Sequence, residues 1–212
     1  MCFSATASFI ASGGLAAISV ASIVSAKKKE KILAIIPLLF AIQQAFEGFQ
    51  WLQIDRGEAS LVAAYGFLLF AFIIWPIYVP SSIYYLDKNR RWLLRWFIFI
   101  GVAVASYFIG LLLTEKLSIT EYKNCIRYDL PIPFNNVVNV SYLLITLYLV
   151  AIFGPLFSSR YKVLNIYGYI ILMFAIIAWF FFVAAFTSVW CFFAAIISVM
   201  FFFYIKNKKA FE

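Results

Sequence analysis

Residues 163–205 read VLNIYGYIILMFAIIAWFFFVAAFTSVWCFFAAIISVMFFFYI, an almost unbroken apolar stretch. A helix rises 1.5 Å per residue, so about 20 residues cross the ~30 Å hydrocarbon layer of a bilayer. The stretch is therefore about twice the length of one crossing. Its polar break is Thr187 and Ser188. We predict two membrane-crossing helices here, over 163–185 and 188–205, joined by a tight turn near Thr187 and Ser188.

The rest of the chain repeats this pattern in units of one crossing each. Of all residues, 66% are hydrophobic and 12% are charged, whereas soluble domains are roughly half apolar and a quarter charged. The apolar runs predict further helices over 5–26, 32–52, 61–86, 92–113 and 137–157. The predicted fold class is all-α: one polytopic membrane domain, residues 1–212, with seven transmembrane helices and a long loop at 114–136.

The basic residues predict the orientation of this domain. Lys27 to Lys31, Lys88 to Arg95, Arg160 with Lys162, and Lys206 to Lys209 all fall on one side of the predicted membrane. By the positive-inside rule that side is cytoplasmic. The other side receives Arg56, Lys116, Lys123 and Arg127. We therefore predict an N-terminus outside the cytoplasm, a C-terminus inside it, and a location in a bacterial inner membrane.

The start of the chain predicts a first helix that is retained. A cleavable signal peptide begins with basic residues, continues with a short apolar run and ends at small residues. Here the order is reversed, because the uncharged opening runs apolar to about Ala26 and the lysine cluster follows it.

The second predicted helix contains the one carboxylate deep inside an apolar run. Gln43, Glu47 and Gln50 share one helical stripe, and Gln44 borders it. A charged group at the bilayer centre costs roughly 2.5–3.5 kcal/mol on insertion scales. The stripe must therefore face the bundle interior or a wet cavity, in the outer half of the membrane.

Two interpretations of this stripe remain open. The structural one is interhelical hydrogen bonding, with Glu47 paired to Arg127 or capped by tyrosine hydroxyls. The functional one is a binding site for a cation, a proton or a polar ligand, because acids inside membranes usually serve a function.

All three cysteines, Cys2, Cys125 and Cys191, are predicted on the outer side. Cys191 fits a small buried residue, the commoner case for a helical cysteine. A disulfide from Cys2 to Cys125 or to Cys191 is a second interpretation. A third is that the Cys2 thiol, beside a free terminal amine after removal of Met1, binds a soft metal or acts as a nucleophile.

The composition also excludes several classes of function. The chain has no histidine, which excludes His-ligated haem, His-rich metal sites and Ser-His or Cys-His catalysis. The cysteines are too few and too scattered for a zinc ribbon or an iron–sulfur cluster. The net charge of +8 comes from clusters at the ends of apolar runs, so it reflects topology, not nucleic-acid binding. We predict no metal and no cofactor.

Five motifs give the chain a resemblance to known sequences. They are Met1–Phe9 (MCFSATASF), Gln43–Trp51 (QQAFEGFQW), Trp75–Pro80 (WPIYVP), Ile126–Pro131 (IRYDLP) and Ser188–Ala195 (SVWCFFAA). Together they resemble an uncharacterised family of small bacterial multi-pass membrane proteins, a domain of unknown function. The resemblance implies family membership and candidate positions. On the predicted topology, four of the five motifs lie on the outer side, which indicates one outer vestibule.

These observations lead to a functional hypothesis with two alternatives. We predict an outward-facing polar pocket centred on Glu47 that binds or transports a small polar or cationic solute. One alternative is an intramembrane thiol-dependent enzyme that uses Cys2 or Cys191, so enzymatic activity stays open. The other is a structural or accessory protein without a small-molecule site. The lipid bilayer is the predicted partner, and a homo-oligomer is left open. The predicted ligand-binding residues are Gln43, Gln44, Glu47, Gln50, Trp51, Arg127 and Tyr128.

Overall fold

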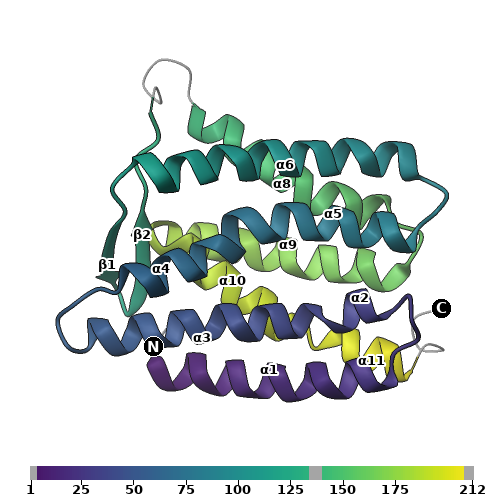
Figure 1. The fold of residues 1–212 in the computed structure, drawn as a ribbon, viewed down its shortest axis with the longest axis horizontal. Helices are drawn as coiled ribbons and strands as arrows, with labels where there is room; N and C mark the ends of the chain where they lie inside the picture. Colours follow the sequence, from purple (N-terminus) through teal and green to yellow (C-terminus); the bar gives the residue numbers. More distant parts are fainter. Residues whose placement is uncertain (1–3, 134–139, 208–212) are drawn as a thin grey trace.

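The computed structural model describes residues 4–133 and 140–207, and it shows a bundle of long helices with a β-hairpin across one end (Figure 1). The elements are α1 (Ala5–Ser25), α2 (Lys31–Ala34), α3 (Ile36–Ile54), α4 (Leu61–Leu68), the π-helical segment η1 (Leu69–Ile74), α5 (Trp75–Leu86), α6 (Arg91–Thr114), β1 (Ser118–Tyr122), β2 (Cys125–Asp129), α8 (Val140–Ser158), α9 (Lys162–Phe182), the 3₁₀ turn η2 (Val183–Ala185), α10 (Phe186–Ile197) and α11 (Met200–Lys206).

Six helical segments of the described residues are long and apolar enough to cross a membrane. They are Ala5–Ser25, Lys31–Ile54, Leu61–Leu86, Arg91–Thr114, Val140–Ser158 and Lys162–Lys206. The observed bounds differ from the predicted ones by a few residues, and the start predicted at residue 137 lies outside the described residues. Large apolar side chains such as Val24, Val62 and Leu113 are exposed on the flanks of the bundle, as expected for a lipid-facing surface.

The last and longest segment, Lys162–Lys206, folds back on itself. Phe182 and Ala185 leave the helical region of backbone space at either end of η2, and α10 then packs beside α9 (Figure 1). The turn predicted near Thr187 and Ser188 is therefore wrong in position, because both residues lie inside α10. The physical reason is that Ser188 is buried, where its hydroxyl donates a hydrogen bond to Glu47.

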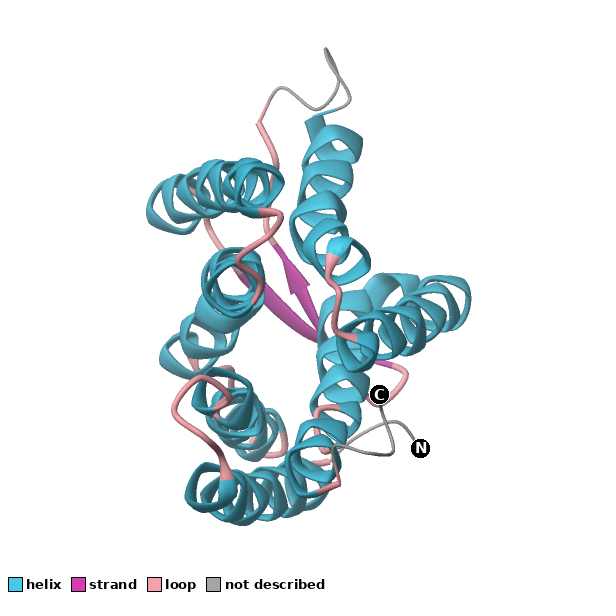
Figure 2. Cartoon of the chain, turned by 90° about the vertical axis from the view of Figure 1, so that its right-hand side faces the viewer, coloured by secondary structure: helices cyan, strands magenta, loops and turns pink. Residues whose placement is uncertain are grey.

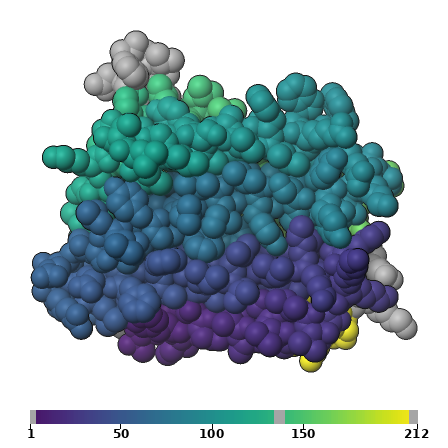
Figure 3. Space-filling view, in the orientation of Figure 1, coloured from purple at the N-terminus to yellow at the C-terminus, as the bar shows by residue number. Residues whose placement is uncertain are grey.

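Packing between the helices joins segments that are far apart in sequence. α1 lies along α3, α5 and α6 both contact α8, and α9 packs between α8 and α10. α10 also contacts α1 and α3, so a helix near the C-terminus packs against the N-terminal helices. Figure 2 looks along the bundle and shows the two strands lying across its far end. On the flank seen in Figure 3, the side chains of α1, α3, α4 and α6 form a continuous surface.

The third segment owes its irregular middle to two prolines. A proline has no backbone N–H to donate within a helix, and η1 directly precedes Trp75 and Pro76. The hydroxyl of Tyr148 in α8 donates to the carbonyl oxygen of Ala71, at 2.6 Å, within this segment. Pro80 likewise leaves the Pro76 carbonyl without its helical donor. A Cβ atom on Gly101 of α6 would lie 1.8 Å from that oxygen, so the close approach of α6 requires glycine.

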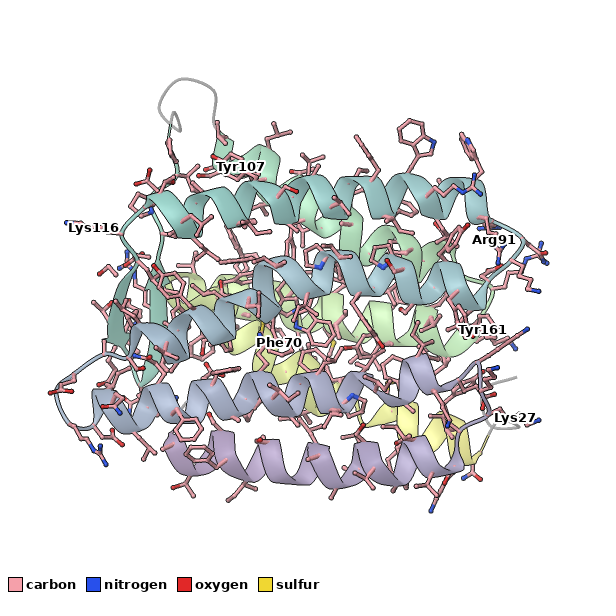
Figure 4. All side chains as sticks on the ribbon, viewed as in Figure 1. Lys27, Phe70, Arg91, Tyr107, Lys116 and Tyr161 are labelled. Carbon is pink, nitrogen blue, oxygen red and sulfur yellow. The ribbon has the colours of Figure 1, made fainter. Side chains whose placement is uncertain are left out.

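The two ends of the bundle differ in charge. Lys27, Arg91 and Tyr161 lie at one end and Lys116 lies at the other (Figure 4). We call the first the basic end, because the α1–α2, α5–α6 and α8–α9 loops there contain the basic clusters. The opposite end, which β1 and β2 cover, is the hairpin end.

At the basic end, the buried carboxylate of Asp87 connects two loops. It accepts hydrogen bonds from the backbone N–H groups of Asn89, at 3.0 Å, and Arg160, at 3.2 Å. The Arg90 side chain adds a bond to the Ser158 carbonyl oxygen at 3.0 Å. Asp87 therefore ties the α5–α6 loop to the α8–α9 loop.

Candidate functional site

The polar stripe of α3 points into the bundle. Gln43, Gln44 and Gln50 are completely buried, and Glu47 is 1% exposed. Gln43 and Gln44 lie near the middle of α3, and Glu47 and Gln50 lie in the half that ends at Ile54. The chain therefore holds an acid and three amides in its interior, where few solvent molecules can satisfy them.

Glu47 obtains its hydrogen bonds from two side chains. The Ser188 hydroxyl of α10 donates to Oε1, and Nε2 of Gln44 donates to Oε2 at 3.1 Å. Arg127 pairs instead with Asp129, with 2.7 Å between Nε and a carboxylate oxygen. The structural alternative in which Glu47 pairs with Arg127 is therefore wrong, because the arginine lies in the exposed hairpin and has a nearer acid.

Gln43 connects the stripe to the kinked third segment. Its Oε1 accepts a hydrogen bond from the indole N–H of Trp75 at 2.8 Å, and the Trp75 ring stacks on Phe40 with the ring centroids 4.0 Å apart. On the α10 side, the buried Cys191 lies close enough to Gln43 and Glu47 to interact with both. Three helical segments therefore position the stripe.

Seven buried side-chain atoms of the described residues have no hydrogen-bond partner there. They are Ser8 Oγ, Gln43 Nε2, Gln44 Oε1, Gln50 Nε2, Gln50 Oε1, Trp51 Nε1 and Tyr128 Oη. Leaving a buried donor or acceptor unsatisfied costs about 1–3 kcal/mol, and native proteins have few such groups. Their concentration at one place marks a site that can form further polar contacts.

The residues that carry these atoms belong to three elements, α1, α3 and β2. α1 runs antiparallel beside α3, and the Ser12 hydroxyl donates to the Ala41 carbonyl oxygen at 2.8 Å. Ser8 lies one turn further toward the hairpin end of α1 and so beside the stripe. Tyr128 belongs to β2, and its buried hydroxyl lies within electrostatic range of Glu47. We call Ser8, Gln43, Gln44, Glu47, Gln50, Trp51 and Tyr128 the polar cluster.

The β-hairpin closes the end of the bundle over the polar cluster. Its two-residue turn, Lys123 and Asn124, has φ angles of 50° and 58°, the geometry that matches the twist of paired strands. Ile126 of β2 is fully buried against Ala5 and Trp51. The sequence predicted only a long loop here, so the hairpin is a finding of the structure.

Tyr128 is the part of the hairpin that faces the cluster. Its ring stacks on Phe67 of α4 with the centroids 5.1 Å apart. Burial, with a smaller contribution from Glu47, raises the pKa of the Tyr128 phenol well above its usual range. The hydroxyl therefore keeps its proton and is a hydrogen-bond donor.

A surface depression of ≈ 320 Å³ lies beyond Tyr128. Arg127 and Asp129 of β2 line it, opposite η2 and the first two residues of α10, Phe186 and Thr187. The seven predicted ligand-binding residues are thus not brought into one open pocket. Gln43, Gln44, Glu47, Gln50 and Trp51 are buried together, Arg127 lies in the depression, and Tyr128 lies between the two.

The cysteines occupy separate positions. Cys191 is a free thiol among the described residues, next to the polar cluster. Cys125 is buried in β2, and its thiol donates to the Lys123 carbonyl oxygen at 3.6 Å. Cys125 and Cys191 form no disulfide with each other. Cys2 lies outside the described residues, so its pairing stays a prediction.

The predicted site did not include Ser8, Trp75 or Ser188. Ser188 was placed in a turn, and Ser8 and Trp75 appeared only as members of two of the five motifs. All three bond to or adjoin the stripe through contacts between distant segments. In the sequence, each of these residues has a hydrogen-bonding side chain and lies within an apolar run. That feature is the signal that could have assigned them to the site.

Comparisons with known proteins give a family but no activity. A family model described as "Family of unknown function (DUF6629)" matches residues 1–212, and the chain therefore belongs to this family. No curated protein and no solved structure matches the chain. The described part of the chain contains no group of three or more His, Cys, Asp or Glu side chains that could hold a metal ion.

Proposed function

We propose that this chain is an integral membrane protein that binds a small polar or cationic solute inside its helical bundle, at the polar cluster. The observation that carries the proposal is the set of partnerless buried polar atoms on Gln43, Gln44, Gln50 and Trp51, which share one face of α3 with the buried Glu47 carboxylate. A protein that used these side chains only to join helices would gain most by pairing them with each other. A solute that supplies the missing partners explains both the burial and the unsatisfied atoms.

The chemistry of the cluster favours an occupant with several hydrogen-bond donors. Glu47, Gln44 Oε1 and Gln50 Oε1 are acceptors, and a primary ammonium group has three donors to place among them. Carboxylate and amide oxygens are also ligands for hard cations. The donors Gln43 Nε2, Trp51 Nε1 and Tyr128 Oη would then bind the polar remainder of an organic solute.

We further propose seven crossings, with the hairpin end outside the cytoplasm of a bacterial cell. The reversal at Val183–Ala185 supports two crossings within Lys162–Lys206. The concentration of lysine and arginine at the basic end supports a cytoplasmic position for that end. Under this topology the solute reaches Glu47 from outside, after movement of Ile126 and Tyr128 in β2. The solute would be bound while the hairpin covers the polar cluster. A transport cycle would require the hairpin to move away from the cluster.

A thermal-unfolding screen of the purified full chain tests the proposal. The panel contains Na⁺, K⁺, ammonium, methylamine, choline and small zwitterionic amines. A ligand at a hundred times its Kd stabilises the folded state by about 2.7 kcal/mol. In a chain of this size that corresponds to a rise in Tm of roughly 5–11 °C.

The matched variants are Glu47→Gln and Glu121→Gln, the second being an exposed acid of β1. We expect Glu47→Gln to abolish the rise in Tm and Glu121→Gln to retain it. Equal responses in the two variants would remove Glu47 from the site. A panel without any stabilising member would reject a site for these solutes.

A further inference from the structure

A second, apolar space lies beside the polar cluster. A cavity of ≈ 260 Å³, which we call the apolar groove, extends between α6, α8, α9 and α10. Its walls are mainly large apolar side chains, among them Phe108, Leu144 and Leu149. Ile145 and Trp179 also line it and are 41% and 45% exposed on the flank of the bundle. The groove is therefore bounded by residues that would meet acyl chains in a membrane.

The apolar groove adjoins the depression that contains Arg127 and Asp129, which we call the polar mouth. Tyr128, Val183, Phe186 and Thr187 line both spaces. The polar mouth lies at η2 and β2, where the helices end. In a membrane this level corresponds to the headgroup region, directly above the hydrocarbon layer.

We propose that the polar mouth and the apolar groove together bind one zwitterionic membrane phospholipid with an ethanolamine headgroup. The phosphate contacts Arg127, the ammonium group contacts Asp129, and one acyl chain lies in the apolar groove. Arginine binds phosphate strongly. A neighbouring carboxylate matches an ammonium group and repels a headgroup with net negative charge.

Three observations support this occupant. Arg127 and Asp129 are 44% and 43% exposed, so both can reach a headgroup. Their ion pair, with 2.7 Å between the paired atoms, places one positive and one negative group side by side in the polar mouth. The groove directly below them is apolar and reaches the lipid-facing flank at Ile145 and Trp179. A headgroup compound without acyl chains would leave the apolar groove without an occupant, which favours a whole phospholipid.

This lipid site is separate from the solute site proposed above. Glu47 is not among the residues that line the polar mouth or the apolar groove. Tyr128 lines the polar mouth and the apolar groove and also belongs to the polar cluster, so the two sites adjoin at this residue. The two proposals share the placement of the chain in a membrane, but Glu47→Gln should leave the lipid site intact.

Native mass spectrometry of the full chain in detergent tests the lipid site. The probes are a phosphatidylethanolamine and a phosphatidylglycerol with identical acyl chains, and free phosphoethanolamine. We expect at least tenfold tighter binding of phosphatidylethanolamine than of phosphatidylglycerol, and no retained phosphoethanolamine. Equal retention of the two lipids would overturn the proposal, as would binding of free phosphoethanolamine as tight as that of the lipid.

Variants on each part of the site make the test specific. Arg127→Ala should weaken phosphatidylethanolamine binding about tenfold, and the control Arg56→Ala, which changes an exposed arginine in another loop at the same end, should not. Asp129→Asn should let phosphatidylglycerol bind as well as phosphatidylethanolamine. Equal effects of Arg127→Ala and Arg56→Ala would show unspecific annular lipid and overturn the site.

The groove is tested by filling it. Leu149→Trp should reduce retention of the lipid while circular dichroism and size-exclusion profiles stay unchanged. If Leu149→Trp does not fold, Ile145→Phe at the exposed edge of the groove provides the same test. Unchanged lipid retention in a folded, groove-filled variant would overturn the proposal.

Discussion

Two buried acids at opposite ends of the bundle differ in how their surroundings satisfy them. Asp87 at the basic end accepts hydrogen bonds from two backbone N–H groups and ties two loops together. Among the described residues, Glu47 accepts hydrogen bonds from the side chains of Ser188 and Gln44, and its neighbours Gln44 and Gln50 on α3 have partnerless polar atoms. Asp87 thus joins two loops through their backbones, whereas Glu47 is bonded by side chains beside polar atoms that have no partner among the described residues.

The contrast also involves the rigidity of the donors. Backbone N–H groups in a loop are placed by the chain itself, so Asp87 stabilises a particular loop geometry. Side-chain donors such as Ser188 and Gln44 can rotate to serve another acceptor. The energetic cost of the partnerless atoms, about 1–3 kcal/mol each, is the kind of cost that proteins retain at functional sites.

The largest expected effect comes from removing the structural acid. Asp87→Ala should lower the free energy of unfolding by about 3 kcal/mol, because two backbone donors near the membrane surface lose a charged acceptor, each worth about 1.5–3 kcal/mol. Chemical unfolding in detergent measures this loss. Asp87→Asn is the control and should lose less, because its remaining carbonyl oxygen still accepts. A loss of the ligand-induced rise in Tm in a folded Asp87→Asn variant would contradict the separation of the two acids.

A smaller effect is expected at Ser188. Ser188→Ala removes one of two donors to the buried Glu47 carboxylate and should lower the free energy of unfolding by about 2 kcal/mol, since bonds to charged groups are worth about 1.5–3 kcal/mol. The control is Ser82→Ala, another buried serine, whose hydroxyl donates to Val79 within its own helix at 2.8 Å. We expect the control to change stability by less than half as much. Equal losses in the two variants would mean that the hydrogen bond to Glu47 stabilises the protein no more than the bond of Ser82 within its own helix.

The smallest change should have the opposite sign. Gln50→Leu removes two partnerless buried atoms, so it should raise the free energy of unfolding by about 1 kcal/mol. It should also weaken binding of any stabilising solute found in the screen. Gln53→Leu, on the same helix but partly exposed, should do neither. A destabilised Gln50→Leu protein would indicate that Gln50 has a structural role. The polar cluster would then stabilise the fold, as Asp87 does.

The helices were predictable because their signal is local. A membrane span needs a run of apolar residues of a certain length, and that length can be counted in the predicted segments 5–26 and 92–113 without knowledge of any contact. The inward orientation of Gln43, Glu47 and Gln50 was also predictable, since an acid and amides have a high cost in hydrocarbon. The structure shows those side chains buried.

The hairpin and the turn were not predictable in the same way. Lys123 and Asn124 form a tight turn without the Asn-Gly or Asp-Gly pair that usually signals one. Ser188 and Thr187 resemble turn residues, yet they lie in α10 because Glu47, 141 positions away, accepts a bond from Ser188. In both places the observed structure differs from the one that the local sequence pattern indicated.

The amino-acid sequence alone determined that the chain is a multi-helix protein suited to a membrane, that its basic residues lie at one end, and that one acid must be kept from lipid. These follow from the transfer of single side chains between water and hydrocarbon, which depends on residue type and spacing. Only the tertiary structure decided which side chains meet Glu47, that β2 covers it, and that Arg127 pairs with Asp129 in a separate mouth. Those outcomes depend on distances between segments that packing alone sets.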